Sequence, residues 1–366
     1  MSHVTGHTDP VFAPVREVFE SFFADGRDTG AGVAVAHQGR LVVDLVGGWR
    51  DDAGKQPWTP ETVVAVYSVS KPFAATCLMI LVDRDLVGLD DPVHRHWPEF
   101  PDDGTTVRHV LAHTAGRPAF PTPRPAEAWA DWDTLAADLA EMTPMWTPGT
   151  VAAEHALSYG HLVGELVRRV DGRPIGRFLA EEVAAPWRLD LAFGSGGRPA
   201  VADLGFGAPD WPATSVGAPG SLRHRGLANP TGCRDLAVLN GPLWRETEVP
   251  AVNLHATAAA VARFYQGMLA GGTLDGRRIL SEAAVAEMCR VQHDGLDHLL
   301  DRTVRWSLGF QIEDDGSFGM GGIGGSCGYA LPSAGLAIGF VTRHLAEFDR
   351  LDELETAVMA VVRGQE

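Results

Sequence analysis

Two side chains that could carry out acyl-transfer chemistry lie three residues apart in the stretch Ser68-Val69-Ser70-Lys71. On a helix this spacing places the hydroxyl and the amine on one face, where they can contact each other. A serine hydroxyl becomes a nucleophile when a base removes its proton, and the dipole at a helix N-terminus holds a lysine closer to neutrality. The free N–H groups of the first turn can also bind an oxyanion. A helix-capping serine beside a solvated lysine has the same spacing.

The lysine content supports a catalytic role for Lys71 over that of a solvated lysine. Lys55 and Lys71 are the only lysines, against 28 arginines. In a chain that otherwise uses arginine, a lysine is suited to a position where an amine must lose its proton, because a guanidinium group does not lose its proton in a protein. Chance composition is the competing explanation.

The elements around this pair show clear periodicities. Apolar spacing predicts a helix over 10–25, and two β-type runs, 32–39 and 41–49, predict a hairpin. A β-branched run then leads into an apolar helix of about 69–83, whose first turn tolerates Pro72. Residues 92–250 read as mostly helical, and β-type runs from 303 onward precede a closing helix over 345–364. We expect the last strands to pair with the first hairpin.

Several stretches, in order from about residue 30 to 343, resemble the serine β-lactamase, DD-peptidase and esterase superfamily, and most closely its class C β-lactamase-like branch and the related carboxylesterases. They are GGWRDDAGKQPWTPETVVAVYSVSK, LVGLDDPVHRHWPEF, VRHVLAHTAGRP, PGTVAAEHALSYGHLVGELVRRVDG, GRRILS and FGMGGIGGSCGYALPSAGLAIGFVTR. The resemblance implies an α/β (α+β) fold with an antiparallel sheet flanked by helices. We expect one catalytic unit over 1–366, with an α/β part at about 1–66 and 250–366 and a mostly helical part at about 67–249.

The resemblance implies three catalytic elements, of which this sequence keeps only the first. The family's tyrosine after the Pro148-Gly149 turn is replaced by Glu154. A carboxylate pointing into the pocket would favour the ammonium form of Lys71 and weaken it as a direct base, so Glu154 itself becomes a candidate base. His155 and Tyr159 are further candidates to replace the tyrosine. A solvent-facing Glu154 in an altered or inactive site is the alternative.

The family's third element, a strand of the form H-x-G or K-T-G, corresponds here to Met320-Gly321-Gly322. A thioether binds anions poorly, so we expect ordinary β-lactams to be disfavoured and an apolar acyl group to be preferred. By analogy with the family, the backbone N–H near Ile323, after Gly322, joins that of Ser68 as the oxyanion hole.

Composition narrows the class of partner. With 366 residues the chain can bury a large core, and its net charge of −17 argues against nucleic acid and anionic membranes. We see no signal peptide or membrane span, so we expect a cytoplasmic protein with a small-molecule substrate. The four cysteines, Cys77, Cys233, Cys289 and Cys327, have no metal or disulfide spacing, and we expect no cofactor. The oligomeric state stays open.

Three further motifs are alternative candidates for functional residues. Gly324-Gly325-Ser326-Cys327-Gly328 matches G-x-S-x-G, but it leads into a strand, so we interpret its glycines as allowing close approach of a substrate. His94 and His96 are expected to be solvated rather than metal ligands. Asn253 is either a pocket residue or a turn residue.

These observations predict a serine hydrolase or acyltransferase that acts on a small ester, thioester or amide through an acyl-enzyme on Ser68. Two alternatives remain: a biosynthetic enzyme that uses Glu154 for non-covalent acid–base chemistry, and a binding protein without turnover.

Overall fold

A computed structural model describes residues 4–208 and 210–364. Its strands are β1 (Thr5–Thr8), β2 (Gly30–His37), β3 (Arg40–Gly48), β4 (Val64–Ala65), β5 (Leu191–Phe193), β6 (Gly205–Phe206), β7 (Leu254–Ala256), β8 (Thr273–Leu274), β9 (Arg277–Arg278), β10 (His293–Asp297), β11 (Arg302–Trp306), β12 (Gln311–Ile312), β13 (Phe318–Gly321), β14 (Cys327–Leu331), β15 (Leu336–Thr342) and β16 (His344–Leu345).

The α-helices are α1 (Ala13–Ala24), α2 (Lys71–Asp83), α3 (Val107–Leu111), α4 (Trp132–Glu141), α5 (Ser158–Asp171), α6 (Ile175–Leu179), α7 (Ala185–Trp187), α8 (Trp211–Thr214), α9 (Leu222–Ala228), α10 (Leu236–Leu239), α11 (Pro242–Glu246), α12 (Ala258–Leu269), α13 (Glu282–Cys289) and α14 (Asp349–Arg363). Short 3₁₀ turns are η1 (Pro10–Phe12), η2 (Tyr67–Ser70), η3 (Val93–Arg95), η4 (Ala126–Ala130) and η6 (Pro332–Ala334), and η5 (Ala180–Ala184) is a π-helical turn.

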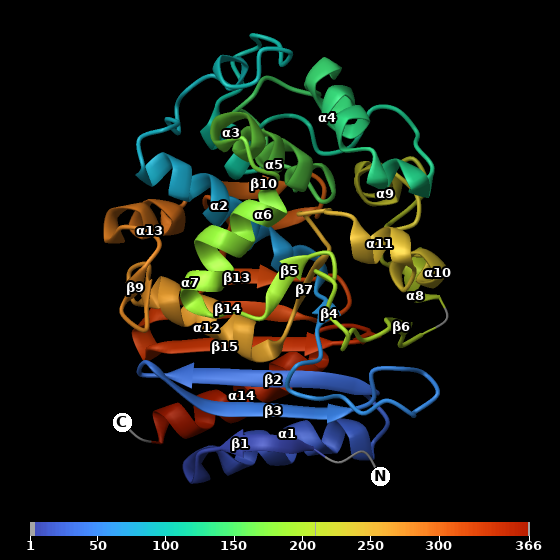
Figure 1. Cartoon of the computed structure of the whole chain (residues 1–366), viewed down its shortest axis with the longest axis vertical. Coiled ribbons are helices and arrows are strands. Elements are labelled where there is room, and N and C mark those ends of the chain that lie inside the picture. The colour runs from blue at the N-terminus through green and yellow to red at the C-terminus, as the bar shows by residue number, and fades with distance from the viewer. Residues whose placement is uncertain (1–3, 209, 365–366) are drawn as a thin grey trace.

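The main sheet has nine antiparallel strands in the order β1-β3-β2-β15-β14-β13-β12-β11-β10. As expected, a late strand pairs with the first hairpin: β15 runs beside β2, with Gly339 opposite Ala34. In Figure 1 the strands from β1 to β13 occupy the lower half of the molecule, while β10 lies higher, close to α2 and α5. The α+β fold with an antiparallel sheet flanked by helices is therefore confirmed.

Helices cover both faces of this sheet, which explains why β2 is apolar throughout rather than alternating. Val33 and Val35 belong to the core formed with α1 and α14, while Ala34 and Ala36 belong to the core on the opposite face. Small residues on this second face let α12 pack closely. A Cβ at Gly339 would lie 2.5 Å from the carbonyl oxygen of Ala258.

A second, three-stranded sheet, β4-β7-β5, connects the helical segment to the main sheet. Its strand β4 leads directly into η2 and α2, the elements that carry Ser68 and Lys71. The sequence predicted a helix from about residue 69, and the structure divides this segment into a 3₁₀ turn followed by an α-helix. The division of the chain into an α/β part and a helical part stays a prediction.

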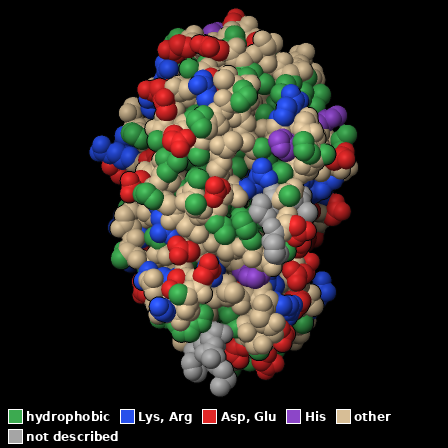
Figure 2. Space-filling view, turned by 90° about the vertical axis from the view of Figure 1, so that its right-hand side faces the viewer, with side chains coloured by type: hydrophobic (Ala, Val, Ile, Leu, Met, Phe, Trp, Pro, Cys, Tyr) green, Lys and Arg blue, Asp and Glu red, His purple; other side chains and the backbone are tan. Residues whose placement is uncertain are grey.

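Charged side chains of both signs are interspersed over the face drawn in Figure 2. Within residues 4–208 and 210–364, no helix is both long and apolar enough to cross a membrane.

Candidate active site

Ser68 lies in a turn that the surrounding structure holds in an unusual conformation. Tyr67, directly before it, has a positive φ of 49°, which is uncommon for a bulky residue and is typical of strained functional turns. The Tyr67 hydroxyl donates to the carbonyl of Cys233 at 3.1 Å. The Ser70 hydroxyl donates to the carbonyl of Tyr67 and accepts from the N–H of Leu254 at 2.9 Å. These contacts from distant parts of the chain stabilise the turn.

Ser68, Lys71 and Glu154 form a contiguous polar group. The Lys71 Nζ lies 2.7 Å from the Ser68 Oγ and 2.9 Å from the Glu154 Oε1. Lys71 is fully buried, while Ser68 and Glu154 are 9% and 7% exposed. Both Ser68 and Glu154 line the same cleft. The structure therefore contradicts both alternatives, a solvated Lys71 and a solvent-facing Glu154.

Backbone contacts position Glu154 in the loop that precedes α5. The N–H of Ala153 donates to the carbonyl of His113 at 3.1 Å, and the N–H of His298 donates to the carbonyl of Ala152 at 3.0 Å. The loop is thus attached both to the end of α3 and to the end of β10. This attachment directs the Glu154 side chain toward α2.

Burial lowers the pKa of the Lys71 amine below its ordinary value, while the charge of Glu154 and its hydrogen bond act in the opposite direction. The sequence reasoning anticipated the effect of the carboxylate but not the larger effect of burial. A lowered pKa increases the neutral fraction of the amine. A neutral Lys71 can accept the proton of Ser68.

His155 and Tyr159 do not contact this group. The His155 Nδ1 lies 2.9 Å from the carbonyl oxygen of Ala153, and burial lowers the pKa of its imidazole to about 3. The Tyr159 hydroxyl donates to the carbonyl of Leu111 at 3.3 Å, and this residue is fully buried. Both side chains support the interior beneath the site rather than its open side.

The segment 320–323 lies directly beside the Ser68 turn. A Cβ at Gly322 would lie 2.2 Å from the carbonyl oxygen of Val66, so only glycine allows this approach. The N–H of Gly322 donates to the carbonyl of Ser326 at 2.7 Å and is not available to a substrate. The N–H of Ile323 meets no acceptor among the described residues. Ile323 therefore stays the candidate second donor of an oxyanion hole.

Met320 and its neighbours form apolar walls around Ser68. Met320 is 6% exposed and packs with Ala152, Val304 and Trp306. Together with Leu227, Leu300 and Ile323 these side chains offer a surface suited to an apolar acyl group.

The cleft, with a volume of about 780 Å³, extends from Ser68 toward α14. Its lining is acidic, with three arginines among six carboxylates. The carboxylates are those of Glu154, Glu313, Asp314, Asp315, Asp352 and Glu355, and the arginines are Arg223, Arg302 and Arg363. This balance disfavours an anionic substrate.

Sequence reasoning missed two residues that lie close to the site. Trp306 lines the cleft, and its indole N–H donates to Asp297 Oδ2 at 2.8 Å. Burial raises the pKa of Asp297, and the nearby charge of Glu154 raises it further. Neither residue belongs to a motif whose spacing points to catalysis, because both reach the site through the pairing of β10 with β11.

The competing motifs have structural roles. Ser326 is buried in the turn before β14, where its hydroxyl accepts from the N–H of Thr342, so no nucleophile elbow forms. The expectation that the glycines admit a substrate is wrong for Gly328, because a Cβ there would lie 2.4 Å from Val261 of α12. Asn253 is a turn residue: it is fully buried, and its amide bonds the backbone of Trp244, Thr247 and Val249.

His94 and His96 pair with different aspartates, Asp102 and Asp91. In the part of the chain that the structure describes, no group of three or more His, Cys, Asp or Glu side chains is arranged to hold a metal ion.

Comparison with known proteins identifies the family. The profile of the family described as Beta-lactamase matches residues 15–362. The esterase/β-lactamase LipL of Mycobacterium tuberculosis is 33% identical over 364 residues, which cover 93% of this chain and 83% of that protein. The chain belongs to the β-lactamase family. The resemblance inferred from the ordered motifs is thereby confirmed.

Solved structures agree with this assignment. A crystal structure of a family VIII carboxylesterase matches this β-lactamase family member with a TM-score of 0.89 at 31% identity, covering 98% of this chain and 100% of that one. A penicillin-binding protein homologue from Caulobacter crescentus matches with a TM-score of 0.87 at 34% identity, with the same coverage. Relatives named as esterases support a serine hydrolase of the β-lactamase fold.

Proposed function

We propose that this β-lactamase family member is a serine esterase that cleaves small carboxylic esters through an acyl-enzyme on Ser68. The observation that carries the proposal is the continuous chain of contacts from the Ser68 Oγ to the Lys71 Nζ at 2.7 Å and on to the Glu154 Oε1 at 2.9 Å. This chain supplies both a base for the hydroxyl and a second acceptor for the proton.

In the acylation step the Ser68 Oγ bonds to the ester carbonyl carbon and its proton passes to the neutral amine of Lys71. The N–H groups of Ser68 and Ile323 stabilise the negative charge that develops on the carbonyl oxygen. When the tetrahedral intermediate collapses, the bond to the alcohol oxygen breaks and Lys71 returns a proton to that oxygen. The products are a free alcohol and an ester of Ser68.

In the deacylation step water attacks the Ser68 ester and gives its proton to Lys71, whose partner is Glu154. The carboxylic acid leaves as the Ser68 oxygen regains a proton. Lys71 and Glu154 together carry the same number of protons before and after the cycle. An alcohol entering in place of water would give acyl transfer by the same steps.

The cleft supports a neutral substrate with an apolar acyl group. Met320 and Trp306 wall the space beside Ser68, and carboxylates outnumber arginines in the lining of the cleft. A β-lactam or another substrate with a carboxylate beside the scissile bond would meet a thioether at position 320 rather than a cation. We therefore expect esters to be preferred over β-lactams.

Covalent labelling tests this proposal. The protein is incubated with a fluorophosphonate and with 4-nitrophenyl butyrate, and its intact mass and nitrophenol release are measured. We expect one phosphonyl adduct and steady turnover in the wild type, and neither in Ser68→Ala. Ser326→Ala is the matched control, because this serine is buried in a turn beside the cleft, and it should retain both. Labelling that survives in Ser68→Ala, or no adduct with any acyl donor, would overturn the proposal.

A further inference from the structure

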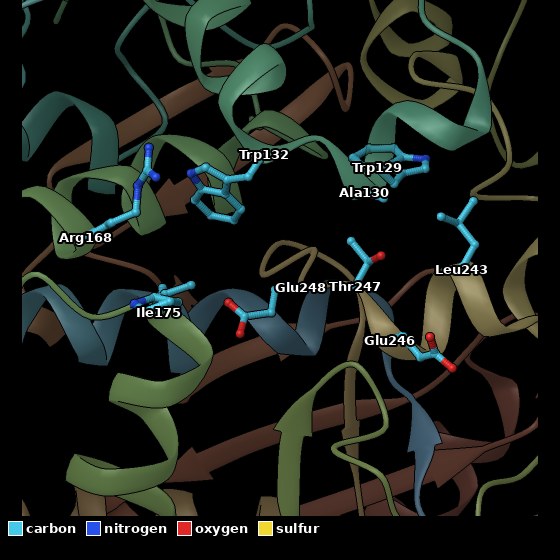
Figure 3. Close-up of a pocket in the computed structure, with 10 residues that line it drawn as sticks. Trp129, Ala130, Trp132, Arg168, Ile175, Leu243, Glu246, Thr247 and Glu248 are labelled. Atoms are coloured by element: carbon cyan, nitrogen blue, oxygen red, sulfur yellow. The ribbon is translucent and has the colours of Figure 1, made fainter.

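A second cavity, of about 520 Å³, lies away from the cleft and shares no lining residue with it. Figure 3 shows Trp129 and Trp132 on one side of this cavity and Ile175, Thr247 and Glu248 on the other. The family's catalytic motifs contribute none of these side chains. Its volume falls within the range of about 300–1,000 Å³ that is typical of small-molecule sites.

The two indole rings that line the cavity are held in place by hydrogen bonds and ring contacts. The Trp132 indole N–H donates to Glu165 Oε2 at 2.8 Å, and its ring stacks on His161 with centroids 4.5 Å apart. The Trp129 indole N–H donates to the carbonyl of Thr231 at 2.9 Å. Indole faces attract cations through the quadrupole of the ring, and this attraction increases when water is excluded.

Glu248 supplies a negative charge across the cavity from these rings. Its Oε2 accepts from the N–H of Gly176 at 3.0 Å, and its Oε1 accepts from no donor among the described residues. Burial raises the pKa of this carboxyl above its ordinary value, and the hydrogen bond from Gly176 acts in the opposite direction. A cation bound beside the carboxyl would favour its charged form. One carboxylate oxygen therefore remains available to a ligand.

The remaining charges leave the cavity negative. Arg168 also lines it, but this guanidinium already pairs with Glu165 and Asp133, each at 2.7 Å. Glu246 adds a second carboxylate to the lining. Ile175 and Leu243 also line the cavity and supply aliphatic surface. An anion would thus meet repulsion here, whereas a cation with an apolar body would meet attraction on both sides.

We propose that this cavity binds a small organic cation, with its ammonium group beside Glu248 and its apolar body against Trp129 and Trp132. The ligand class is a protonated primary amine or a quaternary ammonium ion that carries an alkyl or aryl group. The proposal does not depend on the chemistry of Ser68.

The test compares two probes that differ only in the charged group, 2-phenylethylammonium and 2-phenylethanol, by isothermal titration calorimetry with the full chain. We expect saturable one-to-one binding of the ammonium compound, with the alcohol bound about tenfold more weakly. Glu248→Gln should abolish this preference. Glu313→Gln is the matched control, because it removes a carboxylate from the catalytic cleft instead, and it should retain the preference.

Two further variants guard against misfolding of Glu248→Gln. Glu248→Asp keeps the charge and should keep the preference for the amine, and Trp132→Leu keeps apolar volume but removes the π face and should weaken amine binding. Equal binding of the two probes, no saturable binding, or loss of the preference in Glu313→Gln rather than Glu248→Gln would each overturn the proposal.

Discussion

Replacing Glu154 with glutamine tests the proton path most directly. The substitution keeps the shape of the side chain but removes both its charge and its ability to accept a proton. The carboxylate lies 2.9 Å from the fully buried Lys71 Nζ. Two unit charges at that distance interact with about 6 kcal/mol at an effective dielectric constant of about 20. This attraction supports the charged form of Lys71 and opposes the effect of burial on its pKa.

Without that support the pKa of Lys71, which burial already lowers, falls further in the variant. The amine can still receive the proton of Ser68, but it has no partner to which the proton can pass. We expect kcat/KM for an activated ester to fall by about 10²–10⁴, the usual size of a general acid–base contribution. Lys71 must be neutral to accept the proton of Ser68, so kcat/KM should rise with pH as the amine loses its proton. In the variant this rise should move to lower pH, because the charge that favours the ammonium form is gone.

The assay measures kcat/KM for 4-nitrophenyl butyrate from about pH 4 to about pH 10, to follow the ionisation of Lys71. Ser68→Ala gives the background rate, and Glu313→Gln controls for the loss of a negative charge from the same cleft. If Glu154→Gln retains the wild-type kcat/KM and the wild-type pH dependence, Glu154 lies outside the proton path and the reasoning is refuted.

Other predictions concern stability and substrate range. Lys71→Met and Glu154→Gln should each lower the free energy of unfolding by about 3 kcal/mol, because each leaves one buried partner without the other. In the double variant the loss of free energy of unfolding should be about 1–3 kcal/mol smaller than the sum of the two single losses. Additive losses in urea unfolding would contradict this. Burial lowers the pKa of His161 to about 3. Below about pH 6.5 the unfolded chain therefore binds more protons than the folded chain, and the free energy of unfolding falls as the pH falls. His161→Phe should reduce the slope of the free energy of unfolding against pH by about 1.4 kcal/mol per pH unit, and an unchanged slope would show that His161 is protonated in the folded chain. Met320→Ala should lower the free energy of unfolding by about 2–4 kcal/mol. It should also shift kcat/KM in favour of substrates with longer acyl chains. An unchanged dependence of kcat/KM on acyl-chain length would place the acyl group elsewhere.

Local patterns in the sequence were sufficient for most elements near the nucleophile. The apolar periodicity of 10–25 became α1, the two β-type runs became β2 and β3, and the closing helix became α14. These predictions succeed because helix and strand periods depend on neighbouring residues and on turn residues such as Gly39. The ordered motifs also identified the family, and with it the sheet flanked by helices.

The direction of each polar side chain depended on contacts that no local pattern encodes. Glu154 reaches Lys71 because its loop is bonded to His113 and to His298, which lie far away in the chain. Tyr159, only five residues later, turns toward Leu111 instead. Periodicity says which residues share a face of one element, but it does not say how separate elements are oriented.

The sequence by itself determined that a serine and a lysine share a helical turn, because that spacing is a property of the turn. Only the tertiary structure decided that the lysine is sealed from water and paired with a carboxylate. Burial and pairing arise from segments that meet after folding, and they set the energetic balance between the charged and neutral forms of the lysine.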